Sequence, residues 1–150
     1  MDKKQLIERL NDDLALEYKS IVQSIAHVAS LKGAALQNML TELQAHLFQE
    51  IDHALTLAKQ IDFLGGTPTT EVPAIESWSL AREALEQDLA LEQNQLERLR
   101  QRSQDAAHAG FPDVAEALSP VLAQTQDHVR ELTQALGGQP QSVSTTAGSQ

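Results

Sequence analysis

Apolar residues recur at steps of three and four along four long stretches of the sequence, and this period constrains the fold more than any other feature. Side chains at that spacing line one face of an α-helix, which then buries that face against other helices. The stretches span residues 2–33, 34–64, 77–108 and 113–136. Ala, Leu, Gln and Glu dominate them and β-branched residues are sparse, which favours helix. The sequence therefore predicts an all-α protein.

Local signals mark where these helices begin and end. The predicted N-caps are Asp2 with Gln5 in a capping box, Ser77 or Ser79, and Asp113 with Glu116. The predicted ends lie at Gly33, Gly65, Gly110 and Gly137. Pro120 falls inside the fourth helix and is expected to kink it, because proline has no N–H to donate.

The lengths of the connections indicate how the helices are arranged. The first and third connections are short, whereas residues 65–76 form a long one that contains two prolines. Two helical hairpins joined by one long crossover form a four-helix bundle. We expect one domain over residues 1–137 and a disordered polar tail over residues 138–150, which carry no charge and almost no large apolar side chain.

Charge and composition exclude several classes of function. The chain has 11 basic and 21 acidic residues and a net charge of −10, so it has no excess of positive charge for a nucleic-acid partner. It has no cysteine, which excludes disulfides, thiolate metal sites and cysteine nucleophiles. No apolar run approaches the roughly 18 residues that a membrane span needs. We expect a soluble, cytoplasmic protein with no membrane partner.

Polar side chains interrupt each apolar seam near the middle of its helix. They are Glu17 in the first helix, Glu50 and His53 in the second, Glu92 in the third, and Thr125 and His128 in the fourth. Mid-helix positions in an up-and-down bundle share one level, so we expect these side chains to converge. Adding 75 to positions 17, 50 and 53 gives positions 92, 125 and 128, as an approximate internal two-fold axis would require.

Three carboxylates at one buried level need a compensating interaction, because each would otherwise cost several kcal/mol or take up a proton. No Lys or Arg lies on these seams to neutralise them. One interpretation is a metal site, in which cations from solution supply the positive charge. The other is a protonated or degenerate polar layer that fixes the register of the helices.

Four segments of the chain resemble the bacterioferritins, within the ferritin-like superfamily of di-iron carboxylate proteins. The segments are NDDLALE at 11–17, EIDHA at 50–54, FLGGTP at 63–68 and DLALE at 88–92, and the resemblance extends over about residues 5–136. It implies a ferritin-like four-helix bundle with an iron centre inside it. It also implies oxidation of Fe(II) by O₂ or peroxide, and assembly into homo-oligomeric iron-storage cages.

The resemblance also assigns roles to single residues, which would be both the metal ligands and the catalytic residues. Glu17 and Glu92 look like terminal ligands, and Glu50 looks like a bridging ligand. His53 and His128 look like one nitrogen ligand for each metal. Carboxylate and imidazole ligands suit iron or, as an alternative, manganese.

The sequence departs from the family at four points. Thr125 stands where the family has a second bridging glutamate, which predicts a weakened ferroxidase centre or a single metal. Ile51 replaces the methionine that ligates haem, so we expect no haem. Ser24 replaces a tyrosine near the centre, and the polar tail replaces a fifth helix that the cages use. A homodimer is therefore the smallest assembly that we expect.

Three further polar residues lie near the predicted centre. Asp88, one turn before Glu92, is either the acceptor that holds a ligating histidine or an exposed charge. His46, one turn before Glu50, either lines an access route or is an ordinary histidine. His27 is too far along its helix to ligate a metal at the same level.

Two functions follow from these observations. The first is a di-metal carboxylate protein that binds iron or manganese, oxidises Fe(II) and sequesters the product. The alternative is a bundle with a degenerate or single-metal site that acts through oligomerisation or partner contact, and Thr125 is its main support. A rubrerythrin-type enzyme is disfavoured because the chain has no four-cysteine iron domain.

Overall fold

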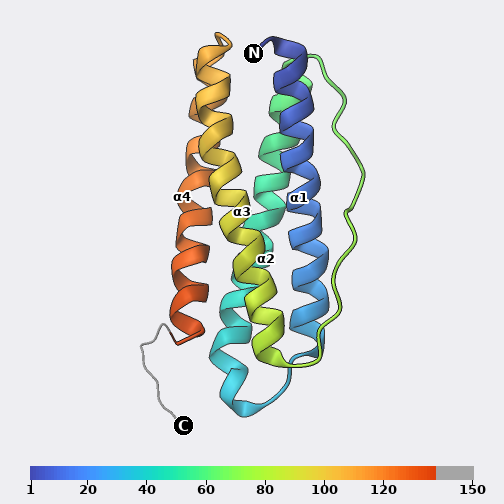
Figure 1. Ribbon diagram of the computed structural model, residues 1–150, viewed down its shortest axis with the longest axis vertical. Coiled ribbons are helices and arrows are strands. Elements are labelled where there is room, and N and C mark those ends of the chain that lie inside the picture. Colours follow the sequence, from blue (N-terminus) through green and yellow to red (C-terminus); the bar gives the residue numbers. More distant parts are fainter. Residues whose placement is uncertain (138–150) are drawn as a thin grey trace.

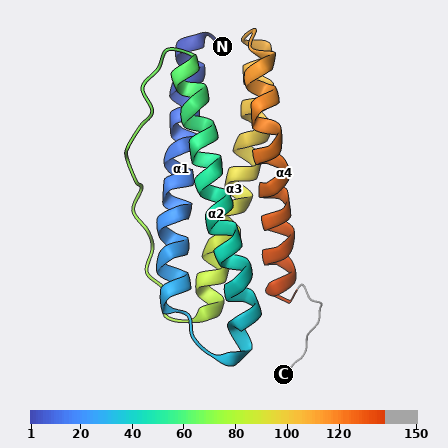
Figure 2. The ribbon, with the colours of Figure 1, turned by 180° about the vertical axis from the view of Figure 1, so that it is seen from behind.

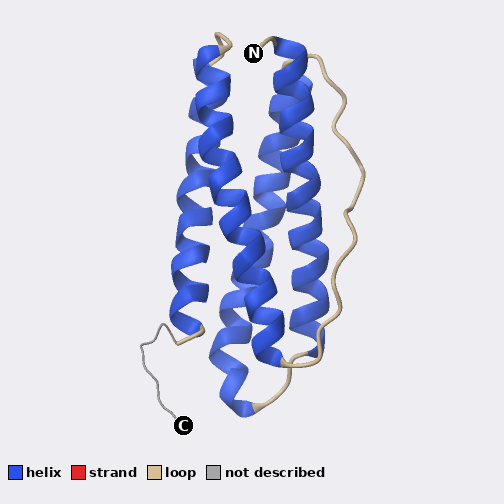
Figure 3. Cartoon of the chain, in the orientation of Figure 1, coloured by secondary structure: helices blue, strands red, loops and turns tan. Residues whose placement is uncertain are grey.

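A computed structural model describes residues 1–137 as four long helices packed side by side (Figure 1). They are α1 (Lys3–Ser30), α2 (Gln37–Phe63), α3 (Ala81–His108) and α4 (Pro112–Ala135), with a short 3₁₀-helix η1 (Ala34–Leu36) before α2. The cartoon coloured by secondary structure shows helices and loops over these residues (Figure 3). The predicted all-α four-helix bundle is confirmed, and the predicted tail at 138–150 lies outside the described residues.

The connectivity is that of two hairpins joined by a crossover. Helix α1 packs on α2 and α3, and α4 packs on α3 and α2. The long connection between α2 and α3 runs along the outside of α1 (Figures 1 and 2). Asn11 holds its start, donating to the Thr67 carbonyl and accepting from the Thr69 N–H, and Lys19 pairs with Glu76 near its end.

Two apolar clusters fill the bundle, one toward each end. The larger one joins the first half of α1 and α4 to the second half of α2 and α3, around Leu10, Leu57 and Leu118. The smaller one lies at the opposite end, around Leu43, Leu85 and Leu132. The middle level, between these clusters, is where the polar side chains of the seams lie. Among residues 1–137, no helix is long and apolar enough to cross a membrane.

The helix ends only partly follow the predicted signals. The capping box of Asp2 and Gln5 is present at the start of α1. The predicted caps Ser77 or Ser79 for α3 are wrong, because Leu80 is the N-cap and no side chain caps that helix. The Ser79 N–H instead donates to a Glu83 carboxylate inside the first turn.

At α4 the predicted cap by Asp113 and Glu116 is also wrong. Phe111 is the N-cap without a side-chain hydrogen bond, and Pro112 opens the helix. Proline suits that position because its φ is already helical and its missing N–H would have had no partner. Helix α4 then continues through Pro120 to Ala135.

Helix α1 ends at Ser30, three residues before the predicted stop at Gly33, whose φ of +120° places it in the turn that leads into η1. At the other end of the hairpin, two glycines follow α2. Gly65 has a φ of +91°, which few other residues adopt. A Cβ on Gly66 would lie 2.5 Å from Cγ2 of Ile7, so this glycine lets the turn pack closely on α1.

Candidate metal centre

The six polar residues of the seams are all buried at the middle of the bundle, namely Glu17, Glu50, His53, Glu92, Thr125 and His128. Helical periodicity explains their burial, since each residue lies on the same helix face as the flanking apolar residues, and that face packs against the core. Glu50, Glu92 and His128 offer ligand atoms that all lie within 4.8 Å of one another. The cluster therefore draws its side chains from α2, α3 and α4.

The remaining predicted ligands adjoin this group. His53 Nδ1 lies 3.7 Å from Glu17 Oε1, and His128 Nδ1 lies 3.4 Å from Glu92 Oε2. The distance from His128 Nδ1 to Glu50 Oε2 is 4.0 Å. Both histidines thus turn Nδ1 toward the carboxylates.

Thr125 is buried beside the cluster but does not take part in it. Its hydroxyl donates to the carbonyl of Val121, one turn earlier on α4, at 2.8 Å. That bond satisfies the hydroxyl within its own helix. The fourth seam therefore brings one ligand-type side chain, His128, to the centre.

Two glutamines hold the outer nitrogens of the histidines. The distance from His53 Nε2 to Gln124 Oε1 is 2.8 Å, and that from His128 Nε2 to Gln49 Oε1 is 2.5 Å. Because an amide oxygen only accepts, Nε2 carries the proton in the neutral form of each ring, and Nδ1 keeps its lone pair. This is the tautomer that a metal ligand needs. Neither glutamine was predicted, although each directly precedes a seam position.

Two serines on α1 bind Glu50. The Ser20 hydroxyl donates to Glu50 Oε2 at 2.6 Å, and the Ser24 hydroxyl donates to Oε1 at 3.4 Å. Ser20 was not predicted, and Ser24 takes a place that the resemblance gave to tyrosine. These donors orient the Glu50 carboxylate, which adjoins the Glu17–His53 and Glu92–His128 pairs.

Asp88 fills neither predicted role. Its carboxylate is buried, and its two oxygens lie 2.9 and 3.0 Å from His27 Nδ1. It also accepts a hydrogen bond from Gln23 Nε2 at 2.8 Å. It therefore holds His27, and the ring of Trp78 meets that imidazole edge-on with centroids 4.4 Å apart.

A second buried aspartate, Asp13, has a similar environment that was not predicted. Arg102, itself buried, donates to Asp13 at 2.6 and 3.2 Å, and Arg98 donates to it at 3.0 Å. Arg102 lies on the buried face of α3, three residues after Leu99, and it pairs with Asp13 and Asp105 rather than with the three glutamates. The expectation that no Lys or Arg lies on the seams is therefore wrong for Arg102, although no ion pair joins it to Glu17, Glu50 or Glu92 within residues 1–137.

The contacts themselves repeat with the 75-residue offset seen in the sequence. The pairs Glu17–His53 and His53–Gln124 correspond to Glu92–His128 and His128–Gln49. The set Asp13, Arg98 and Arg102 corresponds to Asp88, Gln23 and His27. The internal two-fold axis is therefore a property of the packed side chains as well as of the sequence.

Burial and mutual repulsion shift the proton affinities of the centre. Burial raises the pKa of Glu50 well above its ordinary value, and the charges of Glu92 and Glu17 raise it further. Burial, together with the charges of Glu17 and Asp88, raises the pKa of Glu92 to about 8. Without a cation, the centre therefore holds protons at neutral pH.

The two histidines respond in opposite directions. Burial lowers the pKa of His53, but the Glu17 carboxylate near its Nδ1 and the hydrogen bond with Gln124 outweigh burial and raise the pKa overall. Burial lowers the pKa of His128, and the nearby His53 adds to the effect. Two buried atoms of the centre, Glu17 Oε1 and His128 Nδ1, have no hydrogen-bond partner within residues 1–137. Unpaired acceptors at this depth fit a bound cation.

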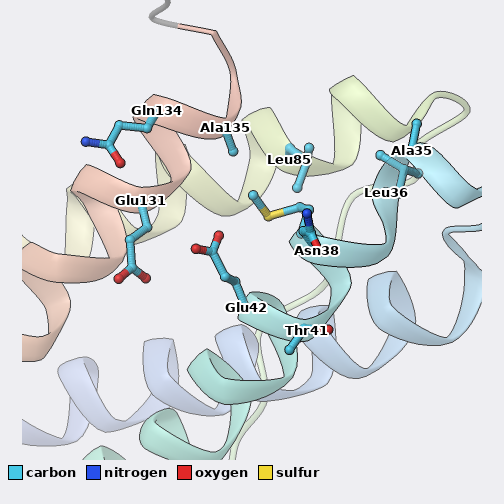
Figure 4. Close-up of a pocket in the computed structure, with 10 residues that line it drawn as sticks. Ala35, Leu36, Asn38, Thr41, Glu42, Leu85, Glu131, Gln134 and Ala135 are labelled. Atoms are coloured by element: carbon cyan, nitrogen blue, oxygen red, sulfur yellow. The ribbon is translucent and has the colours of Figure 1, made fainter.

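His46 links the centre to the surface. Its ring stacks on that of His128 with centroids 3.9 Å apart, and its Nε2 lies 2.6 Å from Glu131 Oε1. Glu131 also lines a surface pocket of about 570 Å³ between α2, α3 and α4, where Glu42 projects a second carboxylate (Figure 4). A chain of polar side chains thus leads from this pocket to His128.

Comparison with known proteins supports the same family as the sequence motifs. Residues 7–140 match the model of the ferritin-like domain. A ferritin-like, diiron-carboxylate protein from Bacillus anthracis strain Ames is 33% identical, with a TM-score of 0.86 over 91% of this chain and 98% of that one.

The bacterioferritin of Rhodobacter capsulatus is 25% identical, with a TM-score of 0.81 over 89% of this chain and 84% of that one. That structure has a metal-free dinuclear site and a haem iron. No protein with a curated function matches the sequence.

Proposed function

This chain is a bacterioferritin-like member of the ferritin-like family, and on that premise we propose that it binds two iron ions inside the bundle and oxidises Fe(II) with O₂ or peroxide. The observation that carries the proposal is the buried group of Glu50, Glu92 and His128, with His53 and Glu17 beside it. The family and this group support metal binding. Manganese is the alternative metal for the same ligands.

The donor set fits the proposed ions. Glu17 with His53 would hold one ion, Glu92 with His128 would hold the other, and Glu50 would lie between them. In its neutral form each histidine presents an unprotonated Nδ1, because a glutamine oxygen accepts the proton that Nε2 carries. Carboxylates stabilise the higher charge of Fe(III), so this ligand set favours loss of an electron from each Fe(II), with O₂ or peroxide as the acceptor.

Metal binding would displace the protons that Glu50 and Glu92 hold in the metal-free protein. The pKa values of Glu50 and Glu92 are raised by burial, and a divalent cation between the carboxylates removes the cause of their protonation. Anaerobic calorimetric titration with Fe(II) or Mn(II) tests the proposal. We expect binding with release of protons, and no binding to Glu50→Ala.

The matched control is Glu97→Ala, which removes an exposed carboxylate from α3. It should bind metal as the wild type does. A wild type that binds fewer than about one ion per chain would refute the metal centre. It would favour the alternative, a non-catalytic bundle that acts through its surface, which Thr125 supports by leaving the centre one carboxylate short.

We also propose that the chain forms at least a homodimer, in the cytoplasm and without haem. The outer face of the first hairpin exposes a group of large apolar side chains, which are Val22 and Ile25 on α1 and Phe48, Ile51 and Leu55 on α2. A second copy covering this face would remove them from water. Ile51 has only a hydrocarbon side chain and offers no haem ligand. Size-exclusion chromatography with light scattering, and the absence of a Soret band after haem addition, test these points.

A further inference from the structure

Gln95 is a buried polar side chain that the proposed centre leaves without a role. It lies on α3 one turn after Glu92 and is only 3% exposed. Its Oε1 and Nε2 both lack a hydrogen-bond partner in the described part of the chain. A buried amide with neither atom paired is rare and costly, so a ligand for it is expected.

The internal two-fold axis locates this amide. Adding 75 to Ser20 gives Gln95, as adding 75 to Glu50 gives Thr125. In the first half of the site, the short side chain of Ser20 donates to the long one of Glu50 at 2.6 Å. In the second half of the site, Gln95 corresponds to Ser20 and Thr125 corresponds to Glu50. The long side chain therefore lies on α3 and the short one on α4, the reverse of the first half.

A second contact agrees with this placement. Gln95 and Glu17 line one narrow gap between α1 and α3, together with Asp13 and Arg98, and Glu17 Oε1 has no hydrogen-bond partner within residues 1–137. The amide of Gln95 therefore lies beside Glu17. Thr125 donates its hydroxyl to the Val121 carbonyl and has no longer side chain that could reach the centre.

We propose that Gln95 is a further metal ligand, whose side-chain oxygen takes from α3 the place that a glutamate at position 125 would take from α4. This inference rests on the proposed metal centre. An amide oxygen is a hard ligand like a carboxylate but carries no charge, and carbonyl oxygens bind divalent cations well. The ion beside Glu17 and His53 is then held with one negative charge fewer than a four-glutamate centre provides.

Anaerobic titration of the metal-free protein with Co(II), followed by its visible absorption bands and by calorimetry, tests this ligand without any measurement of activity. We expect two Co(II) ions per chain for the wild type. Gln95→Leu, which keeps the volume and removes the amide, should bind one ion or weaken the second at least tenfold. Gln93→Leu, exposed on the same helix, is the control and should match the wild type.

The outcomes separate the two proposals. A wild type that binds no Co(II) overturns the metal centre and this ligand with it. If the wild type binds Co(II) but Gln95→Leu retains both ions with unchanged affinity, the centre stands and the role of Gln95 is wrong. Thermal unfolding of Gln95→Leu verifies that it is folded, and its Tm should equal or exceed that of the wild type.

A double exchange provides an independent test. The variant Gln95→Ser with Thr125→Glu rebuilds in the second half the pair that Ser20 and Glu50 form in the first, and it should bind the second Co(II) at least tenfold more tightly than the wild type. Thr125→Glu alone must share its space with Gln95, so it should have a lower Tm and a smaller gain in affinity. If the single and double variants have equal affinity and equal Tm, Gln95 does not occupy that space and the inference is overturned.

Discussion

The raised pKa of Glu92 predicts how the stability of the metal-free protein depends on pH. Burial raises this pKa from 4.5 to about 8, so the folded protein holds a proton that the unfolded chain loses near pH 4.5. Such a group stabilises the fold fully below pH 4.5, and the contribution disappears as the pH rises through 8. The metal-free protein should therefore become less stable from pH 5 to pH 8.

The size of this effect follows from the same two values. The interval from 4.5 to about 8 corresponds to about 5 kcal/mol, with a slope of about 1.4 kcal/mol per pH unit for one proton. Glu50, whose pKa is also raised by burial, adds a change of the same sign. Small domains are stable by roughly 5–15 kcal/mol, so the metal-free protein should be marginal at pH 8.

The variant Glu92→Gln removes one titrating group, because its amide is neutral at every pH. It therefore isolates the contribution of Glu92 to the pH dependence of stability. In EDTA, urea unfolding followed by circular dichroism should give the variant a slope with pH that is shallower by about 1.4 kcal/mol per unit. It should be more stable than the wild type at pH 8. The control Glu97→Gln changes an exposed carboxylate on the same helix and should keep the wild-type slope. Parallel lines for Glu92→Gln and the wild type would refute the reasoning.

Three further perturbations test the surroundings of the centre. Gln124→Leu should reduce metal affinity by about 10–100-fold, measured by calorimetry, because the histidine that it holds loses its acceptor. Gly66→Ala should lower the free energy of unfolding by about 1–3 kcal/mol in urea, since its Cβ would meet Ile7. Asp13→Asn should lower it by about 1–3 kcal/mol, because Arg102 loses one charged partner and keeps Asp105. An unfolding midpoint equal to that of the wild type in either case would contradict the packing described here.

The helices, their pairing and the level of the polar residues could be predicted from the sequence, because periodicity fixes which face of a helix is buried. Glu50 and His53 lie on the apolar seam of α2, so their burial follows from the positions of the flanking leucines. The family, predicted from four short motifs, is confirmed by the match over residues 7–140.

Contacts between side chains on different helices could not be predicted in the same way. Asp88 meets His27 rather than a seam histidine, since the relative heights of α1 and α3 decide which side chains are opposite. The predicted caps of α3 and α4 were wrong, because the direction in which the chain enters each helix decides whether a side chain can reach the first N–H groups of that helix. The 75-residue offset did contain a usable signal, since it relates Gln49 to Gln124 as it relates the ligands.

The internal two-fold axis is broken where Thr125 corresponds to Glu50, and this difference changes the charge of the proposed metal centre. Under the proposed assignment, three glutamates supply −3 against +4 from two divalent ions, and Gln95 adds a ligand atom without charge. Oxidation of both ions to the trivalent state widens the deficit by two. A centre with a fourth carboxylate would hold the oxidised pair more firmly, so this one should bind the divalent state relatively better and release the oxidised product more readily. Under the two proposals, the exchange of a carboxylate on α4 for an amide on α3 would favour passage of iron through the centre over its retention there.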